Sequence, residues 1–96
     1  MKITKLGKAL SNDTRTNILK LLATGSHPSI ETFERYNETY EEEKQRETIY
    51  RELENLVEVG LVAKEYNETA GQIEYRLRQQ QLLVDLGDGT VKEMSD

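Results

Sequence analysis

The sequence predicts an α+β fold of winged-helix type, in which four helices precede a β-hairpin and a second, smaller C-terminal hairpin. Two observations lead to this prediction. Apolar residues recur at helical spacing up to residue 59, and they alternate with polar residues beyond it. Residues that favour caps and turns separate these segments. A chain of 96 residues is the length of one domain, so residues 1–96 are expected to share a single core.

The first two helices are short. The spacing of Ile3, Leu6 and Leu10 predicts the first one. Asn12 is expected to cap the second, because its side-chain oxygen can accept a backbone N–H from the next turn. Gly25 is expected to stop that helix, since glycine adopts the left-handed conformation at low cost.

Residues 30–59 contain neither proline nor glycine and could form one long helix. Its two apolar stripes would then face opposite sides, at 100° per residue. A break near residues 41–45 lets both stripes face one core, so the sequence predicts two helices, the second over residues 46–59. The stripes consist of Ile30, Phe33, Tyr36 and Tyr40, and of Ile49, Leu53, Leu56 and Val57.

Strands are predicted after Gly60. Apolar and charged residues alternate in 72–78, so residues 61–78 are expected to form a hairpin. The Asp88-Gly89 dipeptide between apolar runs predicts a second hairpin. A short helix over residues 79–86 is the competing prediction. A helix–turn–helix followed directly by a two-stranded wing is the winged-helix arrangement.

Composition restricts the possible functions. The net charge of −5 is unevenly spread: residues 1–29 carry +4, residues 30–58 carry −6 and residues 59–96 carry −3. Without cysteine, disulfides and thiolate metal sites are excluded. A single histidine and no organised acid–base pair predict no metal, no cofactor and no enzymatic activity. No apolar run is long enough for a membrane span, so a cytoplasmic location is expected.

Two blocks of sequence resemble ArsR-type transcriptional regulators. They are LGKALSNDTR at 6–15 with ILKLL at 18–22, and ETIYRELENLVEVGLV at 47–62. The resemblance covers residues 3–78 and implies a prokaryotic homodimer that represses or activates transcription. Helix 46–59 would enter the major groove, and the wing at 61–78 would contact the adjacent DNA backbone or minor groove. Metal-sensing members carry a Cys-x-Cys motif, which this chain lacks.

Base contacts are expected from the polar face of helix 46–59. Arg51 can bind guanine and Asn55 can bind adenine through paired hydrogen bonds, and Tyr50 flanks them. The alternative is a solvated face with a Glu47–Arg51 pair. Acidic residues on this face oppose DNA binding, because non-specific affinity comes from cations that displace counterions. They are Glu47, Glu54 and Glu58.

Further contacts are expected outside that face. Phosphate contacts are predicted for Lys44, Arg46, Thr48, Lys64, Arg76 and Arg78. A dimer interface is predicted at Ile3, Leu6 and Leu10. The basic residues of the N-terminal third are expected to be mostly solvated; they are Lys2, Lys5, Lys8, Arg15 and Lys20. For Arg15 the alternative is an ion pair with the acidic middle segment. His27 is expected at the surface or in a cap.

A winged-helix protein–protein module that does not bind DNA is the alternative function. The observation that suggests this alternative is the acidity of residues 30–58, where DNA would dock. Adaptation to a high-salt cytoplasm is another explanation of that acidity.

Overall fold

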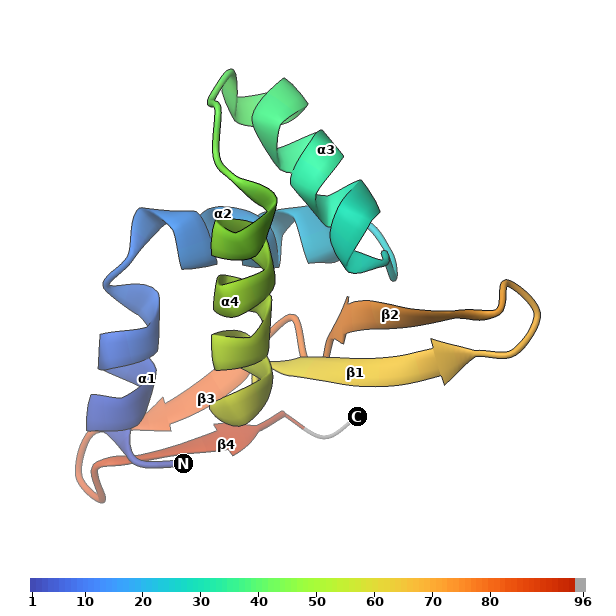
Figure 1. The fold of residues 1–96 in the computed structure, drawn as a ribbon. Coiled ribbons are helices and arrows are strands. Elements are labelled where there is room, and N and C mark those ends of the chain that lie inside the picture. Colours follow the sequence, from blue (N-terminus) through green and yellow to red (C-terminus); the bar gives the residue numbers. More distant parts are fainter. Residues whose placement is uncertain (95–96) are drawn as a thin grey trace.

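The computed structural model describes residues 1–94 and confirms the predicted α+β winged-helix fold (Figure 1). The last two residues of the predicted domain, 95 and 96, lie outside the described residues. The helices are α1 (Ile3–Leu10), α2 (Asp13–Leu22), α3 (Ser29–Tyr40) and α4 (Arg46–Glu58). The strands are β1 (Val62–Asn67), β2 (Gln72–Leu77), β3 (Leu82–Asp85) and β4 (Thr90–Glu93). No helix in residues 1–94 has the length and apolarity that a membrane span requires.

The start of α2 follows the predicted capping chemistry. The Asn12 side-chain oxygen accepts the backbone N–H of Arg15 at 3.0 Å, which satisfies a donor that the first turn leaves free. The helix ends at Leu22, three residues before Gly25. Gly25 has a φ of 149°, which L side chains rarely adopt, so glycine is needed where the chain turns toward α3.

The predicted break between α3 and α4 is confirmed at residues 41–45. Glu41 adopts the left-handed conformation with φ 52° and ψ 42°, which ends α3. The side chain of Asn37 then holds the turn, because it accepts from the Lys44 backbone N–H at 2.9 Å and donates to the Lys44 carbonyl at 3.0 Å. Both apolar stripes consequently face one core. Helix α4 ends at Glu58, one residue before the predicted boundary.

The wing is the antiparallel pair β1–β2, which projects beyond the helices (Figure 1). Val62 pairs with Leu77 at its base and Asn67 with Gln72 at its tip. His27 extends this sheet from the other side, since its backbone exchanges hydrogen bonds of 3.0 and 2.8 Å with Tyr75. The expected surface position of His27 is therefore wrong: it is only 7% exposed.

The second hairpin is also confirmed, and the competing helix over residues 79–86 is wrong. Strands β3 and β4 pair from Leu82↔Glu93 to Asp85↔Thr90. The N-terminus anchors this hairpin, because the Val91 backbone N–H donates to the Met1 carbonyl at 2.7 Å. The hairpin thus completes the core beneath α1. Buried apolar side chains from all four helices, the wing and β4 form that core: Leu6, Ala9, Ile18, Leu22, Tyr36, Ile49, Leu53, Leu56, Leu61, Val62, Tyr75 and Val91.

Candidate nucleic-acid interface

Helix α4 presents its outer face between α1 on one flank and the wing on the other (Figure 1). Its inner face is fixed by Ile49, Leu53 and Leu56, which are completely buried. Arg51 lies opposite this stripe and is exposed. The core therefore determines which side chains of α4 a macromolecular partner can reach.

The three residues predicted to contact bases have different environments. Tyr50 is 46% exposed and lines a cleft of about 280 Å³ with Ile30 and Phe33 from α3. Within residues 1–94, no ion pair engages the exposed Arg51. Asn55 is half-buried, and its Nδ2 donates to Glu52 Oε1 at 2.7 Å. Tyr50 and Arg51 are thus open to a partner, whereas Asn55 already has one.

Most of the predicted phosphate contacts are engaged in ion pairs within the chain. The pairs are Lys44–Glu42 at 3.4 Å, Lys64–Glu54 at 3.1 Å, Arg76–Glu65 at 2.8 Å and Arg78–Glu93 at 3.2 Å. Arg46 is exposed and Thr48 half-buried at the start of α4. Exposed pairs contribute only about 0–1 kcal/mol, so a cation can leave its partner. A phosphate would nevertheless arrive beside a carboxylate, which weakens the gain from counterion release.

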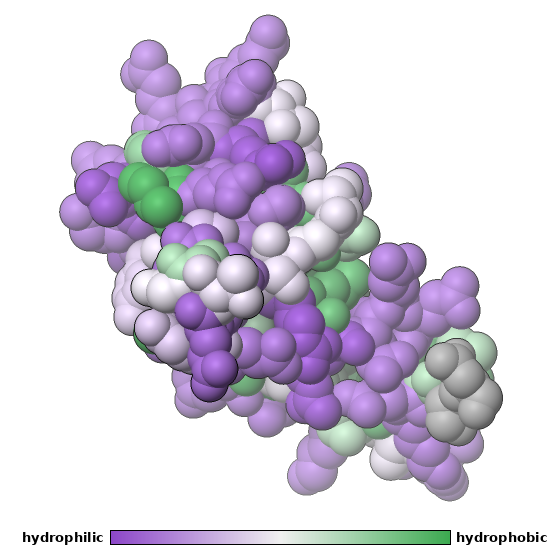
Figure 2. All heavy atoms as spheres, turned by 90° about the vertical axis from the view of Figure 1, so that its right-hand side faces the viewer, coloured by the Kyte–Doolittle hydropathy of each residue, from purple (hydrophilic) through white to green (hydrophobic). Residues whose placement is uncertain are grey.

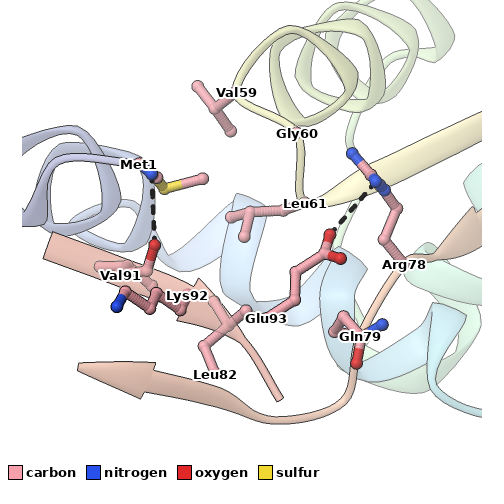
Figure 3. A pocket seen from close by; sticks show the side chains of 10 residues that line it. All are labelled: Met1, Val59, Gly60, Leu61, Arg78, Gln79, Leu82, Val91, Lys92 and Glu93. Carbon is pink, nitrogen blue, oxygen red and sulfur yellow. Dashed lines mark hydrogen bonds and ion pairs between the residues drawn. The ribbon is translucent and has the colours of Figure 1, made fainter. Parts of the chain in front are cut away.

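Arg78 lies beneath the C-terminal end of α4 rather than on the wing. It follows β2 and lines a pocket of about 240 Å³ with Gly60, Leu61 and residues of β4. Figure 3 shows Arg78 and Glu93 pointing toward each other across this pocket. The Arg78 side chain therefore ties the end of the wing to the second hairpin.

Glu54 connects α4 to the wing. Its carboxylate accepts from the Tyr75 hydroxyl, and Lys64 Nζ lies 3.1 Å away. Burial opposes ionisation of Glu54, but hydrogen bonds from Tyr75 and Lys64 lower the pKa of its carboxyl overall. Burial, reinforced by Glu54, raises the pKa of Tyr75. Glu54 was predicted on the outer face of α4, and the structure shows that Tyr75 and Lys64 hold its carboxylate against the wing.

Arg76 and Glu65 form a second pair on the wing itself. Arg76 Nε and Nη2 donate to Glu65 Oε1 at 3.0 and 2.8 Å. The neighbouring guanidinium lowers the pKa of Glu65 and the carboxylate raises the pKa of Arg76. Figure 2 looks onto the side from which the wing projects and shows a mainly hydrophilic surface.

Glu52 is a buried carboxylate beside the candidate site that sequence reasoning missed. It is 8% exposed on α4, and Arg15 Nη1 lies 3.2 Å from its Oε2. Arg15 also donates to the carbonyls of Ala9 at 2.8 Å and Lys8 at 3.2 Å. Arg15 therefore joins the end of α1 to α4, which confirms the alternative of a partner in the acidic segment. One sequence feature could have indicated this burial: on the helix, Glu52 lies beside the apolar stripe that contains Ile49, Leu53 and Leu56.

Comparison with known proteins places the fold among metal-uptake regulators. No protein-family model and no curated protein sequence matches the chain. The structure is similar to the ferric uptake regulator (Fur) of Vibrio cholerae, with 27% identity and a TM-score of 0.63 over 95% of this chain and 74% of that chain. It is similar to FurB, a zinc uptake regulator from M. tuberculosis, with 25% identity and a TM-score of 0.57 over 93% and 74%. The Pseudomonas aeruginosa ferric uptake regulator with manganese shares the fold at 22% identity and a TM-score of 0.62, over 100% and 76%.

The expectation that no metal accompanies this fold is wrong. One of the similar structures contains manganese, and another is a zinc-bound manganese uptake regulator. The donors among the described residues do not fit such an ion, however. Residues 1–94 contain no group of three or more His, Cys, Asp or Glu side chains that could hold one.

Proposed function

We propose that the chain is a DNA-binding transcriptional regulator that inserts α4 into the major groove and lays the β1–β2 wing beside it. The observation that carries this proposal is the exposed outer face of α4, framed by α1 and the wing. Likeness to two uptake regulators at 27% and 25% identity supports it. The first of these two regulators has DNA-binding domains, which undergo a structural rearrangement in its crystal structure.

Arg51 and Tyr50 are the principal base-reading residues in this proposal. Both lie in the first half of α4, and recognition helices contact base edges mainly through their N-terminal residues. A guanidinium free of an internal partner can bind the O6 and N7 atoms of guanine. Asn55 has a smaller role, because binding adenine requires it to leave Glu52. Arg46 and Thr48 contact phosphate at the start of α4, where the helix dipole also favours an anion.

The regulator acts as a homodimer in this proposal, with Leu10 at the centre of the contact. Leu10 is 41% exposed and lines an apolar groove of about 450 Å³ with Leu19, Ala23 and Val84. Of the other two residues predicted at the interface, Ile3 is half-buried and Leu6 is 9% exposed in the chain's own core. Two-fold symmetry would place the two α4 helices in major grooves about 34 Å apart.

Two finer assignments also belong to this proposal. The blocks at 6–22 and 47–62 support membership of the ArsR-like family. A regulator of this kind would act in a prokaryotic cytoplasm, because that is where its operator lies.

A winged-helix module that binds a basic protein is the second candidate. The specific observation in its favour is that Lys44, Lys64 and Arg76 are already paired with carboxylates. Net negative charge on residues 30–58 would then attract a cationic surface.

Fluorescence anisotropy distinguishes these functions. The protein is titrated into a duplex covering the region upstream of its own gene, and into a random duplex of equal length and composition, at several salt concentrations. We expect at least a roughly 10³-fold preference for the upstream duplex. Arg51→Ala should weaken binding to the upstream duplex by a larger factor than binding to the random duplex. Equal and negligible binding to both duplexes at low salt would reject the regulator and favour the protein module.

A further inference from the structure

We propose that the cleft between α1 and α4 binds the DNA backbone, and that lysines of α1, rather than cations of the wing, make most of the ionic contacts with phosphate. This inference rests on the proposed function. It extends that function by assigning phosphate binding to residues that the sequence alone predicts as solvated surface.

The cleft contains a concentration of positive charge. It has a volume of about 380 Å³ and lies beside the C-terminal half of α4. Lys5, Lys8 and Arg15 line it, and Glu58 is the single carboxylate in its lining. Asn55 adds an amide to the same wall. Arg15 is paired with Glu52, so two lysines without an ion pair face one lining carboxylate, an environment that favours an anion.

The lysines of α1 differ from the cations of the wing in their availability. No ion pair in the described part of the chain involves Lys5 or Lys8. Residues 1–12 contain three lysines and no acidic residue. Strands β1 and β2 with their turn contain two cations, Lys64 and Arg76, and both are paired with carboxylates. Counterion release therefore favours the α1 side of α4.

The nearest buried carboxylate, Glu52, does not cancel the charge of Lys5 and Lys8, because it is paired with Arg15. Glu52 is neutralised by Arg15 at 3.2 Å and accepts from Asn55 at 2.7 Å. Arg15 donates to the carbonyls of Lys8 and Ala9, so it is fixed at the inner end of the cleft. Lys5 and Lys8 remain free to reach a phosphate from the exposed side of α1.

The location of the cleft selects DNA as the occupant. Residues of α1 and α4 line the cleft, and α1 lies on the opposite side of α4 from the wing (Figure 1). A duplex seated on the outer face of α4 therefore brings its backbone past α1. Docking helices into the major groove leaves the neighbouring phosphates within reach of such flanking side chains. A small free anion is the competing occupant, and the experiment separates the two.

The test is the salt dependence of DNA binding by the full chain. The slope of log Kobs against log salt concentration is measured for wild type and for Lys5→Gln/Lys8→Gln. Losing two phosphate contacts should reduce the slope by about 1.8. If wild type and variant bind equally at 1 M salt, the smaller slope makes the affinity of the variant roughly 60-fold weaker than that of the wild type at 0.1 M. This loss should be the same for upstream and random duplexes. The charge-matched control Arg35→Gln/Lys92→Gln, at exposed sites on α3 and β4, should keep the wild-type slope.

Four results would overturn the inference. An unchanged slope in Lys5→Gln/Lys8→Gln, with DNA still bound, would reject it while leaving the proposed function intact. An equally large reduction of the slope in Lys64→Gln/Arg76→Gln would show that the wing contributes as much to phosphate binding as α1 does. Binding of inorganic phosphate by the isolated protein, with an unchanged DNA slope, would assign the cleft to a small anion. Absence of DNA binding by the wild type would reject both proposals. Circular dichroism melting confirms that each variant is folded.

Discussion

The connection between Arg15 and Glu52 gives the sharpest prediction about stability. Arg15 is the single side chain that contacts the C-terminal end of α1 and the buried side of α4 together, among the hydrogen bonds of residues 1–94. Replacing it with alanine removes two hydrogen bonds to carbonyls and leaves the Glu52 carboxylate with only Asn55 as a donor. The perturbation therefore creates an almost unpaired carboxylate at a site that is 8% exposed.

The magnitude follows from burial and from the bonds lost. Each hydrogen bond contributes about 1 kcal/mol net. Breaking a buried ion pair by removing one partner costs about 3–5 kcal/mol. The two side chains are 18% and 10% exposed, so water reaches them only partly. We expect Arg15→Ala to lower the free energy of unfolding by about 3 kcal/mol, near the lower end of that range, and to lower Tm by at least about 10 °C.

Urea unfolding at neutral pH, followed by circular dichroism, measures this effect. The control is Arg35→Ala, which breaks the exposed Arg35–Glu31 pair of 2.9 Å on α3. That pair joins residues i and i+4 at the surface, so the control should change stability by less than about 0.5 kcal/mol. The reasoning fails if Arg15→Ala costs less than about 1 kcal/mol, or no more than Arg35→Ala.

Three further predictions concern individual positions. Leu53→Ala should cost about 2–5 kcal/mol in urea unfolding, because this side chain of α4 is completely buried. Glu41→Gly should raise Tm slightly, by an effect of about 0.5–1 kcal/mol, because Glu41 has a φ of 52°; a lower Tm would contradict this. Glu54 has a pKa below its ordinary value of 4.5, so its pairing stabilises the fold above that pH and is lost as pH falls through the folded-state value. Between about pH 5 and 3, wild type should therefore lose more stability than Glu54→Gln, and equal losses would contradict the assignment.

The helices and hairpins could be predicted because their signals are local. Asn12 needs only the next turn to cap α2, and alternation within 72–78 needs only its own strand. The break before α4 could also be predicted, since two apolar stripes on opposite sides cannot share one core. The Asn37 side chain that holds the break could not, because its partner Lys44 is seven residues away and no sequence rule links them.

The candidate site was less predictable because charge pairing is a tertiary property. A helical projection places Glu54 on the outer face, but the wing brings Tyr75 and Lys64 against it. Lys64 was expected at phosphate for the same reason: its nearest carboxylate lies on another element. His27 was expected at the surface because a lone histidine beside proline has no visible strand partner, whereas Tyr75 provides one. Such positions depend on how the elements pack.

Protection of guanine N7 from dimethyl sulfate in the upstream duplex tests the insertion of α4 most directly. N7 lies in the major groove, so a helix seated there shields it. We expect guanines within the bound site to be protected by the wild type, and protection at one or more of them to be lost with Arg51→Ala. Binding that leaves every guanine N7 reactive, with adenine N3 protected in the minor groove instead, would contradict the account.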